Sequence, residues 1–499
     1  MTKEELLEEN ARLKVQILSH KKQNSQQEIK YNALEEQFNQ LLKLLQGFKS
    51  EKLSKSIIGD SQISLFQDLP TTQEQEKEKQ SISYQRTKTK HNGRNKLPEH
   101  LPVKEIIIEP KEDTEGLVKI GEEITETLEY TPASLVKRRT IRPKYAKAEG
   151  NGVIIGELPS RPINKSIAEA SLLAYILVSK FVDHLPLYRL IQKFLREYQW
   201  KPAQSTLCGW VDGCCRLLHP LYNRLKQKLL NSDYIQADES PIKVLDSDKV
   251  RSSHQGYQWV YHSPIDNLVL FDYRKGRGQH GPKEILEDYR GYLQCDGYRV
   301  YDKIGQQQGI TLVGCLAHAR RKFYDAQDND AARAKHVLTL MAKIYKMDKD
   351  IRLKFADDLQ EIHKQRVAQI KPLLQQIKTW IEKQSLKVLP KSSIGKAMTY
   401  FITQYPKLEA TLEDPRIQLD NNLIENKIRP LALGRKNYLF AGSHHAAQNT
   451  AMLYSFFASC KANDINPYLW LKDVLEQLPD YNIQNLDELL PDNWKKSML

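Results

Sequence analysis

Three carboxylates occur at positions where a folded chain could bring them together around a divalent cation. Asp238 closes the alternating apolar run DYIQADE, and Asp296 follows the strand-like run GYLQC. Glu425 lies in the helical pattern LDNNLIENKIRPLALGRKN, on the polar side opposite Ile424 and Ile428. Mg²⁺ prefers hard oxygen ligands, usually one or two carboxylates with water and substrate phosphate. The three side chains therefore predict a magnesium site, with Mn²⁺ as a substitute.

The elements around these carboxylates follow the order of a known type of sheet. Between residues 231 and 328, three strand patterns are followed by a helix, a strand, a helix, a strand and a basic helix. This order predicts a ribonuclease-H-like mixed α/β core, in which three strands form a meander and later strands enter through helical crossovers. The ends of the first and fourth strands are neighbours in such a sheet, so we expect Asp238 and Asp296 to lie side by side.

The third carboxylate is expected on a helix after the fifth strand, in the last part of the core at residues 416–460. We expect this helix to begin at a cap on Asp420 and to stop at Pro430. Two asparagines lie about one turn before Glu425, and Arg429 lies one turn after it, close enough to orient a carboxylate or to touch phosphate.

Simpler interpretations exist for each carboxylate. An aspartate at the end of a strand is most often a turn residue, and a glutamate with an arginine four residues later is most often a solvated ion pair. Glu239 adjoins Asp238 and could be the ligand instead, because strand alternation lets only one of the two face the site. The order of all three carboxylates favours the metal site, and we favour Asp238 over Glu239.

Basic side chains near these positions could neutralise phosphate. The candidates are His318, Arg320, Arg321, Lys322, Arg429, Arg435 and Lys436. Each could equally be a solvated surface charge. The sequence GRKN follows the third carboxylate on the same segment, which makes Arg435 and Lys436 the stronger candidates.

Composition limits the partners of the chain. The net charge of +13 over 499 residues favours a polyanion, nucleic acid before an anionic membrane. No apolar stretch reaches the roughly 20 residues of a membrane span, and the acidic amino terminus does not resemble a signal peptide. We therefore expect a cytoplasmic protein without a membrane partner. The six scattered cysteines are expected to be reduced thiols.

The amino-terminal half predicts separate modules. Residues 1–50 carry an imperfect heptad pattern that favours a coiled coil and a homo-oligomer, with one amphipathic helix on the protein's own body as the alternative. Residues 51–100 hold few aliphatic side chains and predict a disordered linker. Residues 101–160 alternate like the short strands of a small β-rich module.

Residues 161–230 predict helices, the first capped by Ser166, in a helix-turn-helix-like DNA-binding domain. Its second helix would present Ser205, Thr206 and Trp210 to a major groove, although most short-linked helix pairs only pack together.

Two further helical regions complete the chain. Residues 329–415 predict helices inserted into the core, which could contact DNA or could only support the core. Residues 461–499 predict a helical tail.

The motifs YIQADESPIKVL, GYLQCDGYRVYD, VGCLAHARRKFYDA and DNNLIENKIRPLALGRKNYLFAGS together resemble the Asp-Asp-Glu transposases of bacterial insertion sequences, specifically the insertion-sequence-66 type. The resemblance covers nearly the whole chain. It implies DNA transposition by two-metal phosphoryl transfer, with Asp238, Asp296 and Glu425 as catalytic metal ligands. It also implies binding of terminal inverted repeats and target DNA, in a bacterial cytoplasm and near the nucleoid. Whether companion proteins of the same element are needed stays open.

The chain departs from the family pattern in one module. Family members carry a cysteine-bearing, zinc-finger-like region before the helix-turn-helix, whereas residues 101–160 contain no cysteine, so we expect no zinc. Two other functions are considered: a ribonuclease-H-like nuclease or junction resolvase that cuts without joining, and a decayed transposase that only binds DNA. All three carboxylates are present, which does not indicate decay of the catalytic centre.

Overall fold

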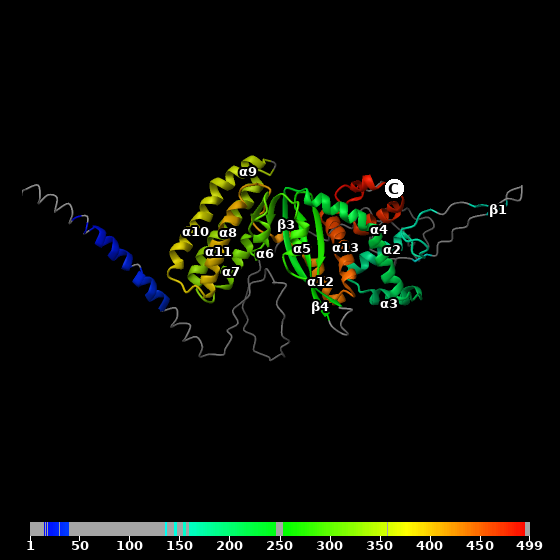
Figure 1. Ribbon diagram of the computed structural model, residues 1–499, viewed down its shortest axis with the longest axis horizontal. Helices are drawn as coiled ribbons and strands as arrows, with labels where there is room; N and C mark the ends of the chain where they lie inside the picture. Colours follow the sequence, from blue (N-terminus) through cyan, green and yellow to red (C-terminus); the bar gives the residue numbers. More distant parts are fainter. Residues whose placement is uncertain are drawn as a thin grey trace, which may run out of the picture. The chain divides into compact units, whose positions relative to one another are not determined.

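The computed structural model of the chain describes residues 159–494 apart from 246–252 and 357, together with helical positions between 14 and 38 and short pieces between 135 and 155 (Figure 1). Chain contacts divide the protein into two units, Glu51–Arg138 and the remainder, Met1–Ser50 with Arg139–Leu499. The predicted linker at 51–100 lies outside the described residues. The fold below is that of the larger unit.

A five-stranded mixed sheet forms the centre of this unit (Figure 1). Its strands are β3 (Tyr234–Leu245), β4 (Ser253–Ser263), β5 (Leu268–Arg274), β6 (Gly291–Gln294) and β7 (Ile310–Val313). Their order across the sheet is β5-β4-β3-β6-β7. The first three strands pair antiparallel, and β6 and β7 join parallel to β3. The predicted meander followed by parallel strands is therefore confirmed.

Short helices connect the later strands, as the sequence predicts. They are α5 (His280–Ile285), before β6, and α6 (Arg299–Ile304), before β7. Helix α7 (Leu316–Asp325) follows the last strand. Strand β3 is longer than its apolar run and continues through Pro241, which is paired opposite Tyr257 of β4.

Helix α13 (His444–Ala462) covers the outer strand of the sheet. The backbone N–H groups of Val269 and Phe271 in β5 donate to the hydroxyls of Ser459 and Ser455, at 2.9 and 2.7 Å. An edge strand with unpaired N–H groups is prone to pair with another chain. The two serines satisfy these donors and fasten the helix to the sheet.

Three helices precede the sheet and pack into the same core: α2 (Ala170–Phe181), α3 (Leu187–Tyr198) and α4 (Gln204–Leu230). The predicted start at Ser166 is wrong. Its hydroxyl accepts from the N–H of Ala168, at 3.0 Å, and the helix begins only at Ala170.

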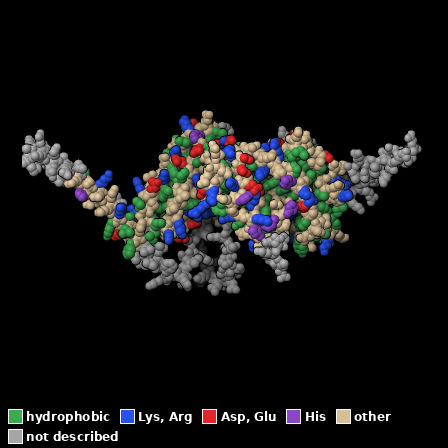
Figure 2. Space-filling model, in the orientation of Figure 1, with side chains coloured by type: hydrophobic (Ala, Val, Ile, Leu, Met, Phe, Trp, Pro, Cys, Tyr) green, Lys and Arg blue, Asp and Glu red, His purple; other side chains and the backbone are tan. Residues whose placement is uncertain are grey.

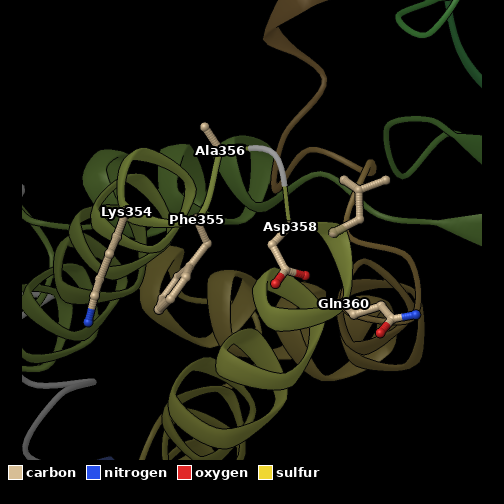
Figure 3. A pocket seen from close by; sticks show the side chains of 6 residues that line it. Lys354, Phe355, Ala356, Asp358 and Gln360 are labelled. Atoms are coloured by element: carbon tan, nitrogen blue, oxygen red, sulfur yellow. The ribbon is translucent and has the colours of Figure 1, made fainter.

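The inserted helices build a second core with α7. They are α8 (Ala331–Lys354), α9 (Leu359–Gln365), a π-helical turn (Arg366–Ile370), α10 (Lys371–Ser385) and α11 (Ser393–Ala410). Figure 3 shows the open hollow between α8 and α9, which is lined by Lys354, Phe355, Ala356, Asp358, Leu359 and Gln360. No carboxylate of the predicted metal site lines it.

The carboxyl-terminal helices return to the sheet. They are α12 (Asn422–Tyr438), α13 and α14 (Pro467–Gln477), followed by 3₁₀ turns at Leu478–Asp480 and Ile483–Leu489. The expected stop at Pro430 is wrong, because α12 continues through this proline to Tyr438. A proline inside a helix removes one backbone hydrogen bond, and packing of Ile428, Leu431 and Ala432 into the body holds the helix together across it.

The amino-terminal modules are described in part. Positions between 14 and 38 are helical, with Tyr31, Leu34 and Phe38 largely exposed. Of the predicted β-rich module at 101–160, the described residues include an antiparallel pair, β1 (Lys144–Ala146) and β2 (Val153–Ile155). None of the helices in the described residues is both long and apolar enough to cross a membrane.

Gly291, at the start of β6, is a position where a side chain should not be tolerated. Its φ is +141°, and an added Cβ would lie 2.4 Å from the carbonyl oxygen of Asp233. We expect Gly291→Ala to lower the free energy of unfolding by about 1–3 kcal/mol or more, measured by chemical denaturation. Gly209→Ala on α4 is the control, because its Cβ meets open space and alanine favours a helix by up to about 1 kcal/mol. Equal effects at both positions would contradict this account.

Candidate active site

The register of β3 and β6 brings two of the predicted carboxylates together. These parallel strands pair Tyr234 with Tyr292 and Gln236 with Gln294. Asp238 and Asp296 each lie two residues beyond the last of these pairs. Side chains two residues apart share a face of a strand, so Asp238 lies on the same side of the sheet as Gln236. Asp296 follows the end of β6 at the same level of the sheet.

The two glutamines connect both strands to the segment that carries the third carboxylate. Gln236 is fully buried, and its amide nitrogen donates to Oε1 of Gln294 at 2.9 Å and to the carbonyl of Asp420 at 3.3 Å. Its own Oε1 accepts from the backbone N–H of Ile424, at 3.1 Å. Gln294 in turn donates to the carbonyl of Gln418, at 2.9 Å. The first turn of α12 is thus held against the first part of β3 and the end of β6.

Asn421 adds a further connection at the start of α12. Its side-chain nitrogen donates to the carbonyl of Ala237, at 3.2 Å, and its backbone N–H lies 3.2 Å from the sulfur of Cys315. Asn421, and not the predicted Asp420, occupies the N-cap position, without a side-chain capping bond. Glu425 follows one turn later and is half-buried.

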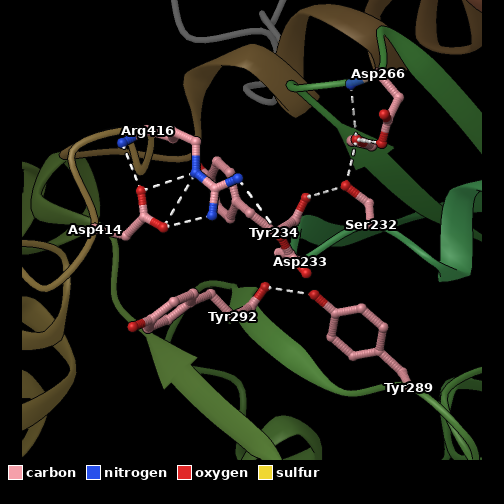
Figure 4. Close-up of polar contacts among 9 residues, drawn as sticks. Ser232, Asp233, Tyr234, Asp266, Tyr289, Tyr292, Asp414 and Arg416 are labelled. Carbon is pink, nitrogen blue, oxygen red and sulfur yellow. Dashed lines mark hydrogen bonds and ion pairs between the residues drawn. The ribbon is translucent and has the colours of Figure 1, made fainter. Parts of the chain in front are cut away.

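A second set of polar contacts holds the chain just before α12 at the start of β3, next to the two glutamines. Arg416 contacts the carboxylates of Asp414 at 2.7 Å and Asp233 at 3.5 Å (Figure 4). The backbone N–H of Gln418 donates to the hydroxyl of Tyr234, at 3.3 Å.

Asp238 lies within the electrostatic influence of the other two predicted carboxylates. Burial raises the pKa of Asp238 well above its usual value, and the nearby charges of Glu239, Asp296 and Glu425 raise it further. Within the described part of the chain, neither Asp238, Asp296 nor Glu425 has an ion-pair partner. Such a cluster attracts a cation, because uncompensated like charges destabilise one another.

Glu239 has a different environment from its neighbour. Its side chain is 3% exposed and accepts from Arg277 at 2.5 and 2.8 Å and, more weakly, from the hydroxyl of Tyr301 at 3.4 Å. The guanidinium of Arg277 also lies over the ring of Tyr298, 4.3 Å from its centroid. Glu239 already has a cation and a hydroxyl as partners, whereas Asp238 has no cationic partner among the described residues.

Arg277 and the two glutamines are site residues that sequence reasoning missed, although signals for them are present. Arg277 lies in the glycine-rich basic loop RKGRGQHG between β5 and α5. Each glutamine begins the same pattern, Gln-x-Asp, in QAD at 236–238 and in QCD at 294–296. Repetition of this pattern at the ends of two neighbouring strands indicates paired side chains on one face.

Asp238, Asp296 and Glu425 have the oxygen ligands of a divalent-cation site, but their side chains do not form a closed coordination group in the described residues. The carboxylates of Asp296 and Glu425 are close enough to Asp238 to influence its pKa. Carboxylate oxygens are the ligands that Mg²⁺ prefers. In the described ranges, however, no group of three or more His, Cys, Asp or Glu side chains lies close enough together to hold a metal ion. The metal site at Asp238, Asp296 and Glu425 therefore stays a prediction.

The predicted phosphate-binding residues fall on two helices. On α7, Arg320, Arg321 and Lys322 are exposed. His318 of the same helix is half-buried beside Asp296 and Glu425; burial lowers its pKa, and the two carboxylates oppose that shift. Figure 2 shows Lys, Arg and His side chains close together in the lower middle of the viewed face.

On α12, Arg429 and Lys436 are exposed. Arg435 is half-buried and donates to the hydroxyl of Ser240 at 3.0 Å and to the carbonyl of Pro241 at 2.7 Å. These bonds fasten the end of α12 to β3, so Arg435 has a structural role in addition to any contact with phosphate.

The predicted DNA-reading residues lie at the start of α4. Ser205 and Thr206 are exposed in its first turn. Trp210 is only 6% exposed and stacks on Trp200, with ring centroids 6.5 Å apart. Its ring belongs to the packing between α3 and α4 in this structure.

Comparisons with known proteins agree with the resemblance drawn from the motifs. The family model described as Transposase IS66 family matches residues 165–449, and the IS66 C-terminal element matches 455–491. A third, Transposase C of IS166 homeodomain, matches 33–106.

Similar proteins occur in Sinorhizobium fredii (strain NBRC 101917 / NGR234). Uncharacterized protein y4jD is 32% identical over 484 residues, covering 91% of this chain and 93% of the relative. Uncharacterized protein y4qI is 30% identical over 481 residues, covering 91% and 88%.

The charge of Asp238 should reduce stability. Because its pKa is raised in the folded state, ionisation as the pH rises above 3.8 lowers the free energy of unfolding. With chelator present, we expect Asp238→Asn to be more stable than the wild type at neutral pH, with the difference disappearing toward acid pH. Thermal unfolding across pH measures this. Asp288→Asn, an exposed carboxylate, is the control. A less stable Asp238→Asn protein at neutral pH would contradict the inferred repulsion.

Proposed function

The chain belongs to the IS66 transposase family, and from this membership and the carboxylate arrangement we propose that it is a DNA transposase that cleaves and joins DNA strands at the ends of its element. The observation that carries the proposal is the shared register of Asp238 and Asp296, with Glu425 connected to the same strand ends through Gln236. This arrangement suits metal-dependent phosphoryl transfer.

We assign the sheet to a ribonuclease-H-like catalytic core. The support is the strand order β5-β4-β3-β6-β7, with an antiparallel meander extended by two parallel strands. Asp238 then lies on the first strand of this core and Asp296 just after the fourth. The helices α8–α11 form an insertion between its fifth strand and its last helices.

Asp238, Asp296 and Glu425 would hold Mg²⁺, or Mn²⁺ in its place. When bound, such ions activate an attacking oxygen and stabilise the leaving oxygen at the phosphodiester. Arg277 keeps Glu239 paired, which leaves Asp238 as the carboxylate of β3 that is available to the metal. Arg320, Arg321 and Lys322 extend from the helix beside the site and would contact the phosphates of the DNA.

Holding two ends of an element requires more than one catalytic chain. Tyr31, Leu34 and Phe38 occupy an exposed stripe at spacings of three and four residues, which is the pattern of a helix that pairs with another. We propose that the amino-terminal helix forms a coiled coil in a homo-oligomer. The expected DNA partners are the terminal inverted repeats and the target, which place the protein at the nucleoid in the cytoplasm.

Asp296→Asn tests the catalytic assignment. Purified protein is incubated with labelled DNA that carries the inverted repeats flanking its gene, with Mg²⁺ or Mn²⁺, and cleavage and joining are scored. We expect the variant to lose at least about a thousandfold in rate, since a metal site contributes several kcal/mol and each 1.36 kcal/mol is tenfold, while DNA binding is retained.

Asp288→Asn should cleave like the wild type. Cleavage without joining by the wild type would favour a nuclease or resolvase. Binding without metal-dependent cleavage would favour a DNA-binding protein that has lost catalysis.

A second pair of variants tests which carboxylate of β3 is used. We expect Glu239→Gln to retain cleavage within about tenfold, because the buried amide can still accept from Arg277, whereas Asp238→Asn loses it. The same cleavage assay compares them. The reverse order of activities would assign the ligand role to Glu239.

A further inference from the structure

A groove far along α12 from the carboxylates has no role in the proposed chemistry. It lies where α2, α3 and α4 meet the end of α12 and the start of α13. Its walls are mainly apolar and include Phe181, Leu187 and Val211 from the first three helices and Tyr438 from α12.

Lys180 contributes a positive charge to this groove without a carboxylate partner. Its Nζ lies 5.0 Å from the ring centroid of Phe181 and 5.5 Å from that of Tyr438. No described carboxylate forms an ion pair with it. Asp212, the acidic residue of the groove, instead contacts His445 at 2.6 Å, Asn449 at 3.2 Å and Arg216. Burial lowers the pKa of Lys180, and a bound anion would favour its charged form.

Two aromatic side chains of the groove are left largely exposed. Tyr188 at the start of α3 is 63% exposed, and Phe440 after α12 is 44% exposed. Large exposed rings beside an uncompensated cation are typical of sites that stack a nucleotide base and bind its phosphate.

The groove lies between the two regions expected to contact DNA. Gln204 and Cys208, one turn apart on α4, line it, and the exposed Ser205 and Thr206 lie on the same turns. At the other side, α12 extends from the groove back to Glu425, over about 20 Å at about 1.5 Å per residue. That distance corresponds to about six base pairs at roughly 3.4 Å each. A DNA strand held by α4 and reaching the carboxylates would pass this groove.

We propose that the groove binds one nucleotide of a DNA strand that has left the duplex, with its phosphate on Lys180 and its base against Tyr188 and Phe440. This inference rests on the proposed function only in taking DNA as the partner. It assigns the groove to unpaired DNA, as found at an opened element end.

The test measures binding of an oligothymidylate of about twelve nucleotides to the full chain, in chelator so that catalysis does not contribute. We expect Lys180→Met and Tyr188→Ala each to weaken binding by about 5- to 100-fold, the range for loss of one stacked base or one phosphate contact. Lys472→Met, whose lysine pairs with Glu476 on α14 outside the groove, is the matched control. Thermal unfolding confirms that each variant is folded.

Asp288→Asn, which changes an exposed carboxylate outside both sites, should bind the oligonucleotide like the wild type. Because the assay contains chelator and measures binding alone, a failure of the catalytic assignment would leave this result unaffected. A 5-iodouracil oligonucleotide should also crosslink to the peptide that contains Tyr188 or Phe440. Equal binding by wild type and both groove variants, absence of binding by the wild type, or crosslinks only elsewhere would each overturn the proposal. Loss of self-association by Tyr188→Ala with unchanged DNA binding would assign the groove to a second copy of the chain and also overturn it.

Discussion

The hydrogen bonds of Gln236 and Gln294 are the interaction on which the candidate site depends. The two amides lie in a fully buried position between β3, β6 and the first turn of α12. A buried amide that loses its partners costs about 1–3 kcal/mol, so the three segments are strongly favoured in one arrangement. Asp238, Asp296 and Glu425 are each within two residues of this network or one helical turn from it. Their proximity is therefore a consequence of how the core satisfies two glutamines.

The inserted helices contribute to the same arrangement from outside the sheet. Asp348 on α8 forms ion pairs at 2.9 Å with both Arg366 and Arg352. Arg352 and Arg366 donate to the carbonyl of Ile417, at 2.7 and 3.1 Å, in the segment that leads into α12. Arg366 is completely buried, and burial lowers its pKa to about 10. A buried ion pair of this kind adds little net stability, yet it holds Ile417 near the glutamines. These contacts support the interpretation of the insertion as a scaffold for the core.

The two adjacent carboxylates of β3 have different electrostatic environments. Glu239 is paired with Arg277, whereas the adjacent Asp238 is destabilised by burial and by its carboxylate neighbours. Perturbed carboxylates without a cationic partner concentrate at functional sites, where a ligand provides the missing charge. Lys180 on α2 is a cation without a carboxylate partner among the described residues. It lies beside the end of α12, about 20 Å along that helix from Glu425. An unpaired carboxylate at Asp238 and an unpaired cation at Lys180 are both expected of a protein that binds a metal ion near Asp238 and a phosphate near Lys180.

The sequence by itself determined the family, the order of strands and helices, and the placement of the two aspartates on neighbouring strand segments, because alternation, turn residues and short motifs are local properties. The predicted end of the first strand at Asp238 is wrong, since β3 continues to Leu245. It also contained the repeated Gln-x-Asp pattern, whose meaning depends on the pairing of β3 with β6. Only the tertiary structure decided that Arg277 pairs with Glu239, that Trp210 is buried against Trp200, and that α12 continues through Pro430. Each of these outcomes depends on contacts between segments far apart in the chain, whose free energies exceed the local preference of any one residue.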